Sequence, residues 1–64
     1  MIYKIKEFRQ EMGMTQKDLA NKSHVSQNLI AQLESGSIEH TSTQTLVKLA
    51  NALDRPVETL FFEK

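Results

Sequence analysis

Residues 15–36, TQKDLANKSHVSQNLIAQLESG, carry the strongest structural signal in the chain. Thr15 followed by Asp18 is a variant of the capping box, in which side chains bond the free N–H groups at the start of a helix. The letters KSHV at 22–25 interrupt the helical pattern, and Ser26 is then a natural N-cap for another helix. A glycine after residue 35 stops that helix. The segment therefore predicts two short helices joined by a turn.

The second of these helices has two unlike faces. At about 100° per residue, Leu29, Ile30 and Leu33 fall within one apolar arc, which predicts the buried face. The opposite arc is uncharged and rich in amides; it holds Gln27, Asn28, Ala31, Gln32 and Ser35. A solvated face normally carries Lys and Glu, whereas an amide offers a donor beside an acceptor and matches the major-groove edge of adenine. From composition alone, base recognition and a polar surface that carries amides by chance both remain open.

The flanking sequence predicts three more helices and almost no strand. A first helix spans 2–12, a fourth follows the N-cap Ser42, and a short fifth begins at Pro56. Their expected inward residues are Ile2, Ile5, Phe8 and Met12 in the first, Leu46, Val47, Leu49, Ala50 and Leu53 in the fourth, and Val57, Leu60 and Phe61 in the fifth. The expected fold class is all-α, with five short helices packed as one domain over residues 1–64.

Composition excludes several classes of function. The 64 residues contain no cysteine, hence no disulfide and no thiolate metal site. Two isolated histidines, with no glycine-rich phosphate loop and no paired catalytic groups, predict neither an enzyme nor a cofactor nor a metal site. No apolar run approaches the ~18 residues of a membrane span, and no signal peptide is apparent, so the expected location is the cytoplasm. The formal net charge is zero, which argues against nucleic-acid binding because such domains are usually basic.

The whole pattern resembles the Cro/phage-repressor type of helix-turn-helix protein, also called the XRE family. The matching residues within the motif are Gln16, Ala20, Val25, Ser26, Ile30, Leu33 and Glu34. Outside it, IKEFRQEMGMTQ at 5–16 is similar to the family's first helix, and TSTQTLVKLANALDRPVETLF at 41–61 to its fourth and fifth. The resemblance implies a compact five-helix, lambda-repressor-like DNA-binding domain, with the helix-turn-helix formed by helices two and three.

By the same resemblance, the third helix lies in the major groove of double-stranded DNA and the second lies across the backbone. Gln27, Asn28 and Gln32, with the small Ala31 beside them, are then expected to contact base edges. Phosphate contacts are expected where helices two to four begin, because free N–H groups and the helix dipole attract anions there. The candidate residues are Thr15, Gln16, Lys17, Ser26, Ser42 and Thr43. Gln16 would contact either a phosphate or the first base. Ser26 would either bond a phosphate or cap its own helix.

Arg9 and Glu34 lie at the apolar sides of the first and third helices. An unpaired buried ion is costly, and the family pairs the residues at these two positions. We therefore expect a structural salt bridge between Arg9 and Glu34 rather than a DNA contact by Arg9.

The chain departs from the family pattern in the turn, the loop and the charge. His24 stands where the motif turn usually has glycine, which implies mild left-handed strain or a reshaped turn. The loop GSIEHTS at 36–42 is longer than the commonest form, and Glu39 within it would repel phosphate, whereas His40 is expected in solvent or near phosphate. Residues 15–43 contain two lysines against three acidic residues, so modest nonspecific affinity and a shallow dependence on salt are expected.

Family members bind inverted repeats as dimers, with half-sites about one turn of DNA apart. With no second domain in the sequence, the expected homodimer interface is Phe62, with Leu60 beside it. The resulting expectation is a sequence-specific transcription regulator, most often a repressor, that is nucleoid-associated when bound to DNA. Two alternatives stay open: an antitoxin or restriction-system controller of the same fold, and a protein-binding helical module that has lost DNA affinity.

Overall fold

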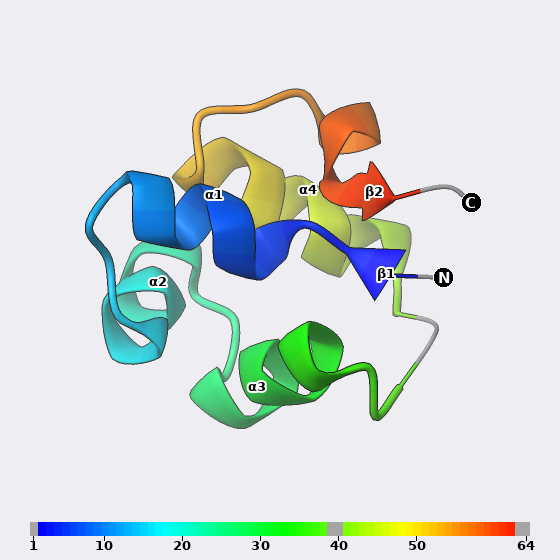
Figure 1. Ribbon diagram of the computed structural model, residues 1–64, viewed down its shortest axis with the longest axis horizontal. Coiled ribbons are helices and arrows are strands. Elements are labelled where there is room, and N and C mark those ends of the chain that lie inside the picture. The colour runs from blue at the N-terminus through cyan, green and yellow to red at the C-terminus, as the bar shows by residue number, and fades with distance from the viewer. Residues whose placement is uncertain (1, 39–40, 63–64) are drawn as a thin grey trace.

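The computed structural model describes residues 2–38 and 41–62 of the chain. Its elements in order are β1 (Ile2–Tyr3), α1 (Ile5–Glu11), α2 (Gln16–Ser23), α3 (Gln27–Ser35), α4 (Thr43–Ala52), the 3₁₀ helix η1 (Val57–Leu60) and β2 (Phe61–Phe62). The α-helices pack around a common interior, and β1 and β2 lie side by side (Figure 1). The expected all-helical class is confirmed, with one short pair of strands added to it.

The expected fifth helix is a single 3₁₀ turn, so the count of five α-helices is wrong by one. The turn follows Pro56, whose carbonyl accepts a hydrogen bond from the backbone N–H of Thr59 at 3.0 Å. The chain then enters β2 directly, which leaves no residues for a second turn. Short segments of this kind are where 3₁₀ geometry is normally found.

The first helix is shorter than its apolar spacing predicts, because residues 2 and 3 are extended. Ile2 pairs with Phe62 and Tyr3 with Phe61 in an antiparallel ladder, and the N–H of Lys4 donates to the carbonyl of Leu60 at 2.8 Å. Backbone pairing with the far end of the chain therefore overrides a helical pattern that is visible only locally.

The helices of the motif begin at the capping residues that the sequence offers. Thr15 and Asp18 form a complete capping box, with both hydrogen bonds 3.0 Å long. Ser26 caps α3 by accepting a hydrogen bond from the N–H of Leu29 at 3.0 Å. These local bonds fix the start of α2 and of α3, because they satisfy N–H groups that have no partner inside the helix.

The core draws on every helix. Its largest fully buried side chains are Ile5, Leu19, Ile30, Leu33, Leu49, Leu53 and Leu60. In Figure 1, α3 forms one edge of the molecule, so its buried side faces the other helices and its opposite side faces outward. The packing of the core thereby decides which residues of α3 a ligand can reach.

Candidate nucleic-acid interface

One face of α3 anchors this helix to the rest of the protein. Ile30 and Leu33 are buried, and Leu29 is half-buried against the same cluster. The main packing partners of α3 are α1, α2 and β1. The buried arc is therefore the one that the helical spacing predicts, and α3 has a fixed rotation about its own axis.

The amides lie on the other face of α3. Gln27 and Asn28 are exposed, while Ala31 and Gln32 are half-buried. Within the described part of the chain, the side chains of Gln27, Asn28 and Gln32 form no hydrogen bond. Their donors and acceptors are free for a ligand. A helix with its side chains is about 10–12 Å across, which suits the ~12 Å width of the DNA major groove.

The start of α2 is more occupied than the sequence suggests. Thr15 accepts from the N–H of Asp18, and the Asp18 carboxylate accepts from the N–H of Thr15. A carboxylate therefore already lies at this helix end, where it competes with an incoming phosphate. Gln16 is half-buried, and its Nε2 donates to Glu34 Oε1 at 3.0 Å. Lys17 is exposed and carries the positive charge at this end of α2.

The N-terminal ends of α3 and α4 differ in whether the capping serine has a hydroxyl proton available for a phosphate. Ser26 uses its hydroxyl oxygen as the cap of α3, so its O–H remains available as a donor. Ser42 accepts from the N–H of Thr45 at 3.1 Å and donates its own proton to Thr45 Oγ1 at 2.9 Å. Its hydroxyl therefore has little left for an anion, whereas Thr43 beside it is exposed.

A salt bridge between Arg9 and Glu34 joins α1 to α3, as expected. Arg9 Nε lies 2.8 Å from Glu34 Oε2 and Nη2 lies 3.0 Å from Oε1, so the contact is bidentate. Arg9 Nη1 also donates to the carbonyl of Met14 at 2.8 Å. The two side chains are only 10% and 4% exposed. The hydrogen bonds to Glu34 raise the pKa of Arg9 above its usual value, and Arg9 therefore stays charged at any pH at which the protein is used.

The motif turn takes the left-handed conformation without a glycine. His24 is the C-cap of α2 with φ 63° and ψ 28°, and its N–H donates to the carbonyl of Ala20 at 2.9 Å. Of the two possibilities that the sequence left open, a strained turn of ordinary shape is the one present. Asp54, after α4, has φ 58°, and both residue types belong to those that tolerate this region best.

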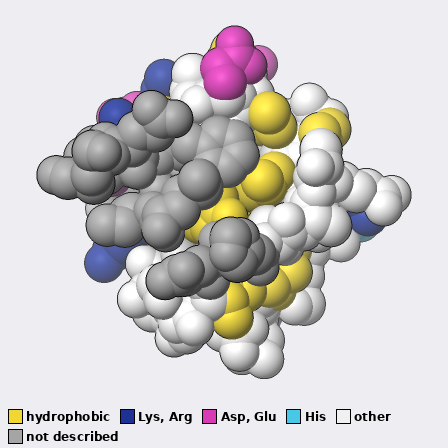
Figure 2. Space-filling model, turned by 90° about the vertical axis from the view of Figure 1, so that its right-hand side faces the viewer, with side chains coloured by type: hydrophobic (Ala, Val, Ile, Leu, Met, Phe, Trp, Pro, Cys, Tyr) yellow, Lys and Arg dark blue, Asp and Glu magenta, His cyan; other side chains and the backbone are white. Residues whose placement is uncertain are grey.

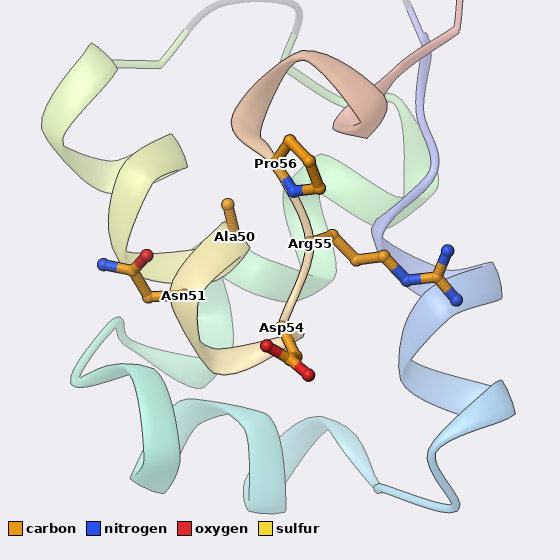
Figure 3. A pocket seen from close by; sticks show the side chains of 5 residues that line it. All are labelled: Ala50, Asn51, Asp54, Arg55 and Pro56. Atoms are coloured by element: carbon orange, nitrogen blue, oxygen red, sulfur yellow. The ribbon is translucent and has the colours of Figure 1, made fainter.

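A shallow hollow of about 240 Å³ lies at the end of α4, lined by Ala50, Asn51, Asp54, Arg55 and Pro56 (Figure 3). Its charged side chains do not converge. Arg55 turns toward α1, where Nη2 bonds Glu11 Oε1 at 2.8 Å and the guanidinium lies 4.3 Å from the centre of the Phe8 ring. In the described ranges, no three His, Cys, Asp or Glu side chains are grouped to hold a metal ion. None of the described helices has the length and apolar character of a membrane span.

The expected dimer residues need correction. Leu60 is 0% exposed, so it belongs to the core and has no surface to offer a partner. The side chain of Phe62 lies outside the described residues, as do Glu39 and His40. Val47, by contrast, is 41% exposed although it was expected to point inward. It lies about 100° around α4 from Leu46, so the buried face formed by Leu46, Leu49, Ala50 and Leu53 leaves Val47 outside.

Two helices, α2 and α3, are joined by a tight turn, and α3 has its polar face outward on a core that contains a buried salt bridge. This arrangement defines the helix-turn-helix class of nucleic-acid-binding protein. The sequence profile of the helix-turn-helix family matches residues 5–60, and the chain belongs to this family, in its Cro/phage-repressor (XRE) type. It is a DNA-binding helix-turn-helix regulator. A comparison with curated proteins finds no match.

Proposed function

We propose that the protein is a transcriptional repressor that binds an inverted-repeat operator as a homodimer, with α3 of each subunit in the major groove. The observation that carries this proposal is the division of α3 into a buried apolar face and a free amide face. Amides with no internal partner gain their hydrogen bonds from a ligand, and base edges supply both acceptors and donors.

Gln27, Asn28 and Gln32 are the proposed base-contacting residues. Gln27 and Asn28 occupy the first turn of α3, and the N-terminal residues of a recognition helix are the ones that contact base edges. Ala31 lies between them and Gln32 and permits close approach. Because an Asn or Gln amide pairs with N6 and N7 of adenine, the operator is expected to have A·T pairs at the positions that these residues contact.

We propose that the phosphates of the DNA backbone contact Lys17, Gln16, Thr43, Ser26 and the free N–H groups at the starts of the helices. Lys17 is the one cation among the candidate contact residues. A dimer would then neutralise about two phosphates through lysine, and the log of the association constant should fall with the log of salt concentration with a slope near −2. Binding therefore depends on base contacts and on dimerisation more than on charge.

The proposed dimer surface is formed by α4 and η1, which pack against each other. Val47 of α4 is exposed, and Val57 of η1 is half-buried. Figure 2 shows that hydrophobic side chains are also exposed on one face of the molecule. A second copy packed on this surface would bury the exposed side chain of Val47.

The proposal is tested by selecting bound duplexes from a random pool and then titrating the preferred duplex with salt. An inverted repeat with A·T pairs at fixed positions is the expected result. Gln27→Ala should then lose discrimination at one base pair of each half-site by ~1–3 kcal/mol, with Gln10→Ala on α1 as the matched control. Equal weakening on all sequences would show that Gln27 does not specify a base, and no preferred sequence at all would overturn the proposal in favour of a protein-binding module.

A further inference from the structure

Glu34 accepts hydrogen bonds from two residues rather than one. Arg9 donates through Nε and Nη2, and Gln16 donates through Nε2 to Glu34 Oε1 at 3.0 Å. Glu34 is on α3, whereas Gln16 is the first residue of α2. A largely buried carboxylate therefore reaches from the core to a residue at the proposed DNA-backbone contact.

The chemistry of Glu34 fixes the orientation of the Gln16 amide. A carboxylate has acceptors only, so the amide must turn its nitrogen and not its oxygen toward Glu34. The bidentate contact with Arg9 holds the Glu34 carboxylate in place beside Gln16. The Gln16 nitrogen has a second hydrogen, and no described residue accepts a hydrogen bond from it. A DNA phosphate also has acceptors only, so it needs this same nitrogen.

We propose that Glu34 is a positioning residue for DNA binding, which holds the Gln16 amide with its free N–H available to a backbone phosphate. The inference rests on the proposed function. Ordering a glutamine side chain costs rotamer entropy; here that cost falls on folding and not on complex formation. In this proposal Glu34 has two functions: it pairs with Arg9, which already compensates its charge, and it positions Gln16.

A double-mutant cycle separates positioning from plain structural support. Dissociation constants are measured by fluorescence anisotropy on the selected duplex for wild type, Gln16→Met, Glu34→Gln and the double variant. The temperature is one at which circular dichroism shows all four to be folded. Gln10→Met is the control for placing a methionine on the surface. Glu34→Asp replaces Glu34→Gln if the latter folds poorly, because it keeps the charge but withdraws the acceptor from Gln16.

We expect Gln16→Met to weaken binding roughly two- to tenfold in the wild-type background and less than about twofold once Glu34 is changed. The side-chain ¹⁵N–¹H signals of Gln16 should also show one hydrogen-bonded proton in the free protein, lost in Glu34→Asp. If Gln16→Met weakened DNA binding by the same factor with and without the change at Glu34, the inference would be overturned, because Glu34 would then act on the fold alone. The inference would also be overturned if Gln16→Met had the same dissociation constant as wild type on a duplex that wild type binds. Failure of wild type to bind any duplex would instead overturn the proposed function.

Discussion

Replacing Arg9 by methionine should destabilise the protein far more than the loss of one hydrogen-bonded contact implies. The change keeps an unbranched, apolar stem on α1 but leaves the Glu34 carboxylate, 4% exposed, with Gln16 as its remaining side-chain partner. Removing one member of a buried ion pair typically costs about 3–5 kcal/mol, because the other charge stays away from water without compensation.

That cost is large for a chain of this size. At about 0.05–0.15 kcal/mol per residue, 64 residues correspond to a total stability of roughly 3–10 kcal/mol. In a domain this small, about 1 kcal/mol shifts the melting temperature by roughly 4–8 °C. Arg9→Met is therefore expected to lower Tm by at least about 12 °C. If the stability of the wild type is near the lower limit and the cost of the substitution near the upper limit, the variant is largely unfolded at room temperature.

The assay is thermal and urea denaturation monitored by circular dichroism, on Arg9→Met and on the double variant Arg9→Met with Glu34→Met. Two apolar side chains in place of a buried pair are often neutral, so the double variant should recover most of the loss. Arg55→Met is the matched control: its pair with Glu11 is 40% and 59% exposed, and its removal should cost no more than about 1 kcal/mol. A double variant as unstable as the single one would refute the reasoning, because lost packing and not a stranded charge would then be the cause.

Three further predictions concern the turn, the cap and the proposed dimer. His24→Gly should raise stability by about 0.5–1 kcal/mol in thermal melts, since glycine adopts φ 63° without the strain of a Cβ; a loss would mean that the imidazole makes a contact of greater value. Ser26→Ala should cost about 1 kcal/mol through the lost cap of α3, and an unchanged urea midpoint would show that water replaces the hydroxyl. Val47→Lys should leave circular dichroism unchanged while shifting sedimentation toward the monomer, because the exposed Val47 supports no core packing; an unaltered dimer would place the interface elsewhere.

The local signals in the sequence were reliable where a residue and its partner are only a few positions apart. Thr15 and Asp18 form the capping box, Ser26 caps α3, and the buried arc of α3 follows the helical spacing. These interactions involve neighbours within one helical turn, so the amino-acid order alone is sufficient to specify them.

The errors arose where the decisive partner is distant in the sequence. Ile2 and Tyr3 have helical spacing but pair with Phe62 and Phe61, and β2 in turn cuts the last helix to one 3₁₀ turn. Val47 is exposed because α4 presents only one side to its neighbours. The sequence contains the apolar residues but not the direction from which other elements approach.

By itself, then, the amino-acid sequence determined the four α-helices, the turn between α2 and α3, and the set of amides that α3 carries. Only the tertiary structure decided that those amides lack hydrogen-bond partners among the described residues, that Leu60 lies in the core, and that Gln16 bonds the carboxylate which pairs with Arg9. The physical reason is the range of the forces involved. Caps and helical spacing act between neighbours along the chain, whereas burial and the pairing of buried charges depend on which distant segments the folded chain brings together.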